Sequence, residues 1–245
     1  ASERFSVGSN LDAYFLADPD GGPYSGIQLV VPIEQFSDLK LGDSVQVTGS
    51  LEEFHCMTQI RALNVVVVAG QAPPAAAAVT VADLMDTALA EPYESVLVKV
   101  SNVVATEGPN EYGEYTLEGG LIVDDLLMKG EVQLPLSTPI ESVTGFVSFS
   151  FGKYKLAPRN AADLAFPGGP ATDTGGATTD TGDHRDGSII DEGAPREDTG
   201  GGNDTGGGPA TTTTIAAIQQ ASGSIGCTEP GPVDTLRNVV VEQAT

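Results

Sequence analysis

The chain has 245 residues, of which 34 are Asp or Glu and 11 are Lys or Arg, so its formal net charge is −23. This charge argues against a protein that follows nucleic-acid phosphates, because such proteins need clustered basic side chains. The length leaves room for two small domains. No apolar run reaches the roughly 18–20 residues of a membrane span, and with no leader recognisable we expect the mature form of a secreted protein.

Residues 1–70, called module 1 below, are patterned as β-structure. Short apolar strands are expected at 12–17 and 26–31, separated by a turn rich in Asp, Pro and Gly. Residues 44–54 alternate apolar and polar positions as in a half-buried strand, and 57–70 closes the module. Residues 71–78 contain two prolines and a run of alanines, which predicts a linker.

Residues 79–166, called module 2, repeat module 1 with a constant offset of 96 positions, which indicates a duplicated unit. A few short strands in about 90–105 residues per unit fit a small closed or partly open barrel, with an OB-like barrel as the best match. The matched positions are Val47-Thr48-Gly49 with Val143-Thr144-Gly145, Ile60 with Leu156, and Asn64 with Asn160.

The rest of the chain divides into a spacer at 167–210 and a final part at 211–245, called the C-terminal segment. The spacer is rich in Thr, Gly and Asp and nearly free of large apolar residues, which favours a linker. In the C-terminal segment, residues 214–218 match 80–84 and residues 237–240 match 101–104, the opening of module 2. Module 1 lacks such an opening, so we interpret the C-terminal segment as its missing first part. The predicted fold is all-β, with two tandem OB-like small barrels, the acidic spacer and a C-terminal donor strand.

The runs YFLADPDGGPYSGIQLVV (14–31) and LKLGDSVQVTGSLEEFHCMTQI (39–60) resemble OB-fold modules of bacterial secreted and surface proteins. Modules of this kind accompany extracellular nucleases and occur in surface lipoproteins of myxobacterium-like bacteria, and the C-terminal segment is similar to the part that normally precedes them. The resemblance implies an extracellular or cell-surface location. It implies no catalysis, because the nuclease domain of the enzyme relatives is missing. The chain departs from the family in one respect: its first module is split between the two ends.

The residues for catalysis are sparse. A hydrolase needs a clustered base, nucleophile or metal, yet the chain has only His55 and His184. His55 and Cys56 form no dyad, because neighbouring side chains on a strand point to opposite faces. The sequence therefore predicts a protein that is not an enzyme.

Two acidic groups are candidate calcium sites, and no other cofactor is expected. Asp18 and Asp20 stand in a turn whose Asp and Gly residues also have a purely conformational explanation. Asp183 and Asp186 stand in the spacer, where a solvated acidic linker is the alternative and the spacing does not fit an EF-hand.

Covalent sugar is expected in the spacer, which is Thr-rich as in secreted glycoproteins. Asn203 begins an N-x-[ST] pattern. The candidate sites are Asn203, Thr174, Thr181, Thr199 and Thr205.

Aromatic residues of the two modules are a further candidate site. Such rings can stack on sugars or bases, and the alternative is that they fill the barrels. They are Tyr14, Phe15, Tyr24, Phe54, Phe149, Phe151 and Tyr154.

The split of module 1 suggests how the chain associates. A barrel without its first strand leaves unpaired backbone groups, which are normally covered. The C-terminal segment can return to its own module 1 in cis, or enter the module 1 of the next molecule in trans, and we favour trans. A third interpretation is that the chain is one period of a longer polypeptide. The proposed donor-strand residues are Val233, Leu236, Val239, Val240 and Val241.

Cys56 and Cys227 are the only cysteines, and a bridge between them would lock the C-terminal segment to the module that it completes. The alternative is a pair of buried thiols. The sequence therefore predicts an extracellular structural protein that polymerises head to tail into a filament, with itself as partner. The alternative is a non-catalytic module of a secreted or surface hydrolase that binds carbohydrate, calcium or nucleic acid.

Overall fold

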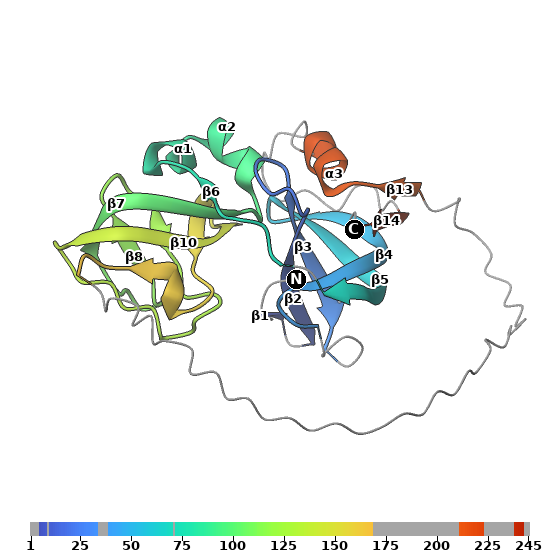
Figure 1. Cartoon of the computed structure of the whole chain (residues 1–245), viewed down its shortest axis with the longest axis horizontal. Helices are drawn as coiled ribbons and strands as arrows, with labels where there is room; N and C mark the ends of the chain where they lie inside the picture. The colour runs from blue at the N-terminus through green and yellow to red at the C-terminus, as the bar shows by residue number, and fades with distance from the viewer. Residues whose placement is uncertain are drawn as a thin grey trace, which may run out of the picture.

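The computed structural model describes residues 5–8, 10–33, 39–70, 72–168, 211–222 and 238–242. Most of these residues lie in strands, and the helices among them are short. The all-β fold of small barrels predicted from the sequence is confirmed. Two units lie side by side, module 1 in blue and cyan with the red C-terminal segment, and module 2 in green and yellow (Figure 1). No helix in the described ranges is long and apolar enough to cross a membrane.

Module 1 and the C-terminal segment form one seven-stranded sheet with the order β1-β2-β3-β5-β4-β14-β13. Its parallel pairs are β3 with β5 and β13 with β14, and the other neighbours are antiparallel. The C-terminal segment also contributes helix α3 (Ile215–Ser222). The strands are β1 (Phe5–Gly8), β2 (Leu11–Ala17), β3 (Gly26–Pro32), β4 (Asp43–Phe54), β5 (Met57–Gly70), β13 (Thr211–Thr213) and β14 (Asn238–Glu242).

Module 2 forms a second seven-stranded sheet with the order β12-β10-β11-β9-β8-β7-β6. An additional antiparallel pairing of β10 with β7 closes five of these strands into a barrel. The strands are β6 (Ala77–Ala78), β7 (Leu97–Glu107), β8 (Tyr115–Leu117), β9 (Ile122–Val123), β10 (Pro139–Ser150), β11 (Lys153–Ala157) and β12 (Leu164–Ala165). The helices are α1 (Val81–Met85), α2 (Thr87–Ala90), η1 (Glu91–Tyr93) and η2 (Ala161–Asp163). Because β6 pairs with β7, the linker is two residues shorter than the sequence indicated.

The two modules share one pairing scheme. In module 1 the parallel pair joins Leu29 to Ile60, and in module 2 it joins Val123 to Leu156. Ile60 and Leu156 stand at the offset of 96 found in the sequence. The offset does not extend to Asn64 and Asn160, because Asn64 lies within β5 whereas Asn160 caps η2.

The strand glycines of the repeat have a steric role. A Cβ on Gly49 would collide with the backbone of Arg61, and one on Gly145 would lie 2.6 Å from the carbonyl carbon of Ala157. Each glycine therefore lets the long hairpin of its module coil closely on itself. Both hairpins turn at residues with positive φ, His55 and Cys56 in module 1 and Phe151 and Gly152 in module 2.

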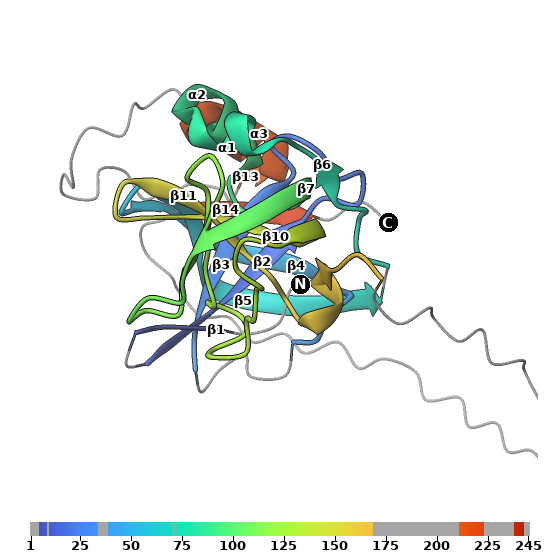
Figure 2. The same cartoon turned by 90° about the vertical axis from the view of Figure 1, so that its left-hand side faces the viewer.

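The modules meet through an aromatic cluster. The ring of Phe15 stacks on Phe5 at 5.0 Å and on Phe146 of module 2 at 4.7 Å between centroids. A Cβ on Gly26 would collide with the backbone of Ser95, so a glycine there permits close contact between the modules. Figure 2, in which module 2 faces the viewer, shows α1, α2 and α3 at the same end of the molecule.

Candidate assembly site

Helix α3 of the C-terminal segment begins with a threonine cap. The Thr214 Oγ1 accepts a hydrogen bond from the backbone N–H of Ala217 at 3.1 Å. In module 2 the Thr80 Oγ1 accepts from the N–H of Asp83, also at 3.1 Å. A threonine cap satisfies a backbone donor that has no partner inside the helix, so the same residue type fixes both helix starts. The sequence match of 214–218 with 80–84 is confirmed.

The apolar side of α3 completes the core of module 1. Ile215 is fully buried and Ile218 is 4% exposed, in a cluster that includes Tyr14, Leu29 and Val47. Leu84 of α1, the equivalent of Ile218, is 1% exposed in the core of module 2. Burying two isoleucines contributes about 3–6 kcal/mol, which ties the C-terminal segment to module 1.

Polar contacts hold the same helix in place. The Gln219 Nε2 donates to the carbonyl oxygen of Gly26 at 2.6 Å. The carboxylate of Asp18 accepts a hydrogen bond from the backbone N–H of Ala216. Burial raises the pKa of Asp18, the hydrogen bond from Ala216 opposes this, and the charge of Asp20 adds to the rise. Asp18 therefore acts as a second cap for α3.

The strand of the C-terminal segment adds to the edge of β4. β14 pairs antiparallel with β4, with Val241 opposite Val47. In module 2, Val143 lies opposite Val100, so Val241 is the structural counterpart of Val100. The parallel pairs give the same correspondence between the modules. Thr211 lies opposite Val239 in the C-terminal segment, and Ala77 lies opposite Val98 in module 2. The sequence alignment of 237–240 with 101–104 was wrong by five positions.

The described part of the C-terminal segment lies on module 1 of its own chain, which is the cis arrangement (Figure 1). Val239, Val240 and Val241 lie in β14 as expected for a donor strand, whereas Val233 and Leu236 fall outside the described residues. Cys56 lies in the β4–β5 turn, and Cys227 falls outside the described residues. Their disulfide stays a prediction.

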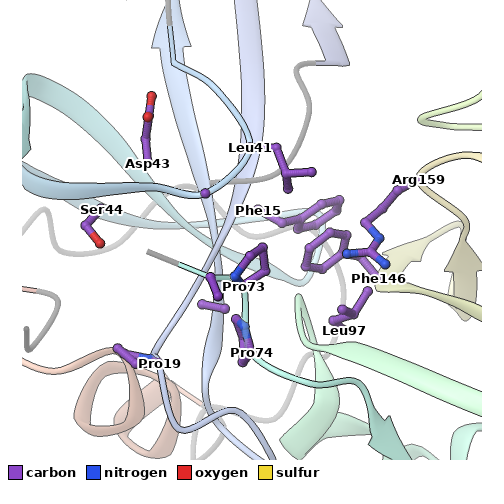
Figure 3. Close-up of a pocket in the computed structure, with 13 residues that line it drawn as sticks. Phe15, Pro19, Leu41, Asp43, Ser44, Pro73, Pro74, Leu97, Phe146 and Arg159 are labelled. Carbon is purple, nitrogen blue, oxygen red and sulfur yellow. The ribbon is translucent and has the colours of Figure 1, made fainter. Parts of the chain in front are cut away.

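A small cavity lies where the modules meet the linker (Figure 3). The rings of Phe15 and Phe146 and the side chain of Arg159 lie on one side, and Pro73 and Pro74 of the linker lie beside them. The cavity holds about 40 Å³, which is room for one or two water molecules. This junction is therefore a packed contact between the modules.

A larger groove runs between the hairpin tips of the two modules. Its volume is about 700 Å³, within the range of ligand sites. Phe54 is 51% exposed and Phe151 is 97% exposed, and both line it together with Gln28, Ser148 and Asp124. A large apolar side chain at positive φ, as at Phe151, is uncommon and marks a position worth testing for function.

The other predicted aromatics lie inside or near the cores. Tyr14 and Phe15 are at most 1% exposed, Tyr154 is 6% exposed, and Tyr24 and Phe149 are half-buried. Only Phe54 and Phe151 of that set present most of a ring to solvent. The barrel-filling interpretation therefore applies to most of the set.

Of the predicted calcium and sugar sites, the structure describes only Asp18 and Asp20. Asp18 and Asp20 gather no third ligand, and no group of three or more His, Cys, Asp or Glu suited to a metal occurs among the described residues. The remaining candidates all fall outside the described residues: Asp183, Asp186, Asn203, Thr174, Thr181, Thr199 and Thr205.

One buried polar position went unnoticed in the sequence. Lys155 of β11 is 5% exposed, and its Nζ donates to Glu114 and, at 3.2 Å, to Asp124. The module 1 counterpart at the offset of 96 is Gln59, also 5% exposed, which accepts from Gln28 and donates to Glu52, each at 3.2 Å. The repeat offset was the signal that could have found both.

Comparison of the chain with protein-family models, with curated proteins and with solved structures gives no match. The resemblance to OB-fold modules of secreted proteins therefore stays a prediction. What bears on function is the geometry of the C-terminal segment and of the module junction.

Proposed function

We propose that the protein is a non-catalytic structural subunit of the cell surface or extracellular space that assembles head to tail, with the C-terminal segment of one chain completing module 1 of the next. One observation carries the proposal: the part that completes module 1 comes last in the chain, separated from it by all of module 2 and the spacer. Covalent sugar on the spacer would be compatible with this role.

The contacts of the C-terminal segment support an exchange between chains. Ile215, Ile218 and Gln219 bind module 1 through side-chain burial and one hydrogen bond, and β14 binds through backbone pairing. These contacts are the same whether the segment comes from the same chain or from a neighbour. Exchange of an identical element is a low-cost route to association, and a head-to-tail contact that does not close into a ring generates a filament. Protein concentration then decides between the closed monomer and the polymer.

The test uses a chain terminator. In the full chain, Ile218→Asp places a charge in the core contact of α3, so this variant accepts a C-terminal segment but donates a defective one. We expect wild-type protein to form multimers whose mean mass rises with concentration in light scattering. The Ile218→Asp variant should stay monomeric, and a tenth of it added to wild type should shorten the multimers.

The matched control is Leu84→Asp, the equivalent change in module 2. Its helix is continuous with the module that it completes, so the variant keeps both a sound C-terminal segment and a sound acceptor. It should enter wild-type multimers without shortening them. Wild type that stays monomeric at every concentration, or equal shortening by both variants, would rule out polymerisation by exchange of the C-terminal segment.

A denaturing gel with and without reductant tests the predicted bridge. If Cys56 and Cys227 join different chains, a ladder of multimers should collapse to the 25.1 kDa chain on reduction. A single band that shifts slightly on reduction would mean that the bridge closes within one chain. Cys56→Ser should remove either effect.

The groove between the hairpin tips favours a second candidate, a non-catalytic ligand-binding module of a secreted or surface hydrolase. Exposed rings beside amide, hydroxyl and carboxylate groups suit a neutral carbohydrate, and the charge of −23 disfavours nucleic acid. Saturable binding of a soluble oligosaccharide by the monomer, lost in Phe151→Ala and kept in Tyr112→Ala, would support this candidate. Tyr112 is also exposed but lies outside the groove.

A further inference from the structure

A buried carboxyl group joins the two modules. Glu94, which follows η1 at the start of module 2, is 2% exposed. Its Oε1 accepts a hydrogen bond from the backbone N–H of Thr58 in module 1 at 2.8 Å. Its other oxygen, Oε2, and the neighbouring Ser95 Oγ are both buried without a hydrogen-bond partner in the described structure. A carboxylate with one bare oxygen is far costlier to bury than a neutral carboxyl group.

The described surroundings of Glu94 hold negative charge that no cation compensates. Glu53 faces it from β4 and Glu91 faces it from η1, and both charges disfavour its ionisation. Thr58 donates through Oγ1 to Glu53 at 2.6 Å, and the hydroxyl of Tyr154 on β11 donates to Glu91. Three carboxyl groups and one phenol thus share a junction built from both modules.

Two cations on the neighbouring strands are paired with other acids. Arg61 of β5 lies 3.9 Å from Glu52, and Lys155 of β11 binds Glu114 and Asp124. Among the described residues no metal-ligand group forms at the junction either. A proton is therefore the species that can neutralise Glu94 in place.

We infer that the module junction is a proton-dependent latch, closed while Glu94 is protonated and loosened when Glu94 ionises. The proton need not leave before the junction opens, because solvent reaches Glu94 only when the modules part. Ionised Glu94 then gains hydration in the open state that the closed state denies it. A single chain contains every part of this latch, so it operates with or without assembly.

The direction of the pH effect follows from linkage. Burial first, and then the charges of Glu91 and Glu53, hold the pKa of Glu94 well above its usual value, and the hydrogen bonds from Thr58 offset only part of this rise. The closed junction therefore binds more protons than the open one. Its stability is fully present below the ordinary Glu pKa of 4.5 and falls as pH rises from there through the raised pKa of the closed state.

Hydrogen exchange of the Thr58 amide tests the latch, because that amide is the donor to Glu94. After correction for the intrinsic rate, its protection in wild type should fall about tenfold for each pH unit within the window. In Glu94→Gln, which keeps a neutral acceptor of the same shape, the fall should be much smaller, and what remains comes from Glu53, whose pKa burial also raises. The amide of Val98, deep in module 2, serves as the internal reference, and its protection should stay constant in both proteins.

Glu141→Gln is the matched control, because Glu141 is an exposed glutamate on β10 away from the junction. It should behave as wild type does. Constant protection of Thr58 in wild type as the pH rises above the ordinary Glu pKa of 4.5 would overturn the inference, because a raised pKa in the closed state requires the fall to begin there. So would an equal fall in wild type and Glu94→Gln. Should Glu94→Gln fail to fold, the wild-type ratio of Thr58 to Val98 protection decides by itself.

Discussion

Module 1 and module 2 reach the same pairing scheme by different routes through the chain. Module 2 is built in order, from β6 and α1 to β12, within residues 77–165. Module 1 takes its opening, β13, α3 and β14, from the far end of the sequence. The opening of a module is therefore defined by its threonine cap, its buried helix residue and its strand pairing. The place of the opening along the chain does not define it.

The largest expected difference between the modules concerns the buried position held by Lys155 in one and Gln59 in the other. Lys155→Met leaves Glu114 and Asp124 without their cation, which should cost about 3–5 kcal/mol of unfolding free energy. Gln59→Met removes one hydrogen bond to the amide of Gln28 and one to the carboxylate of Glu52, and should cost about 1–3 kcal/mol. Denaturant titration of both variants measures the two costs.

The pH dependence sharpens this contrast. Desolvation opposes ionisation of Glu114, but the hydrogen bonds from Lys155 and Asn110 and the charge of Lys155 leave its pKa lowered. Ionised Glu114 therefore contributes to the free energy of unfolding above the ordinary Glu pKa of 4.5. This contribution is lost as the pH falls through the lowered pKa of the folded state. The cost of Lys155→Met should shrink on acidification, and that of Gln59→Met should change less, because Gln59 carries no charge and binds one carboxylate where Lys155 binds two. Equal pH profiles would contradict the ion-pair account.

The next largest loss of stability is expected from the strand glycines, and it should be the same in both modules. Gly49→Ala and Gly145→Ala each add a Cβ against the backbone of the following strand. We expect each to lower the free energy of unfolding by about 1–3 kcal/mol, because backbone must move to admit the methyl group. Hydrogen exchange, followed separately in each module, measures its free energy of unfolding. A large loss in one module only would show that the two hairpins coil differently.

The smallest expected loss of stability comes from removing the helix caps. Thr214→Ala and Thr80→Ala each remove a cap at the start of a helix and should cost about 1 kcal/mol. The first should loosen the C-terminal segment from module 1, and the second should loosen α1 within module 2. Amide exchange of Ile218 and Leu84 reports the two helices, and serine at either position, which keeps the hydroxyl, should restore most of the loss.

Much of this architecture was visible in the sequence because its signals are local. The strands at 12–17 and 26–31 correspond closely to β2 and β3, and Thr214 indicated a helix start through its similarity to Thr80. The strand register was not visible. Matching 237–240 to 101–104 relied on one asparagine and two valines beside it, and an odd slip of five exchanges the two faces of a strand. Only the pairing partner fixes that choice.

The module junction was not visible in the sequence either, and the reason is different. Glu94 stands in a segment with no strand or helix pattern, and Thr58 lies 36 positions away in another module. Nothing in the composition marks that carboxyl group as buried, because glutamates are nearly always exposed.

The late position of the C-terminal segment determines the order in which the two modules can fold during synthesis. From the end of β5 at residue 70 to the start of β13 at residue 211, a ribosome needs roughly 7–30 s at typical rates. During that interval module 2 can complete its barrel, while β4 of module 1 remains with one edge uncovered. The first half of this chain thus matures after the second, which reverses the usual order of vectorial folding.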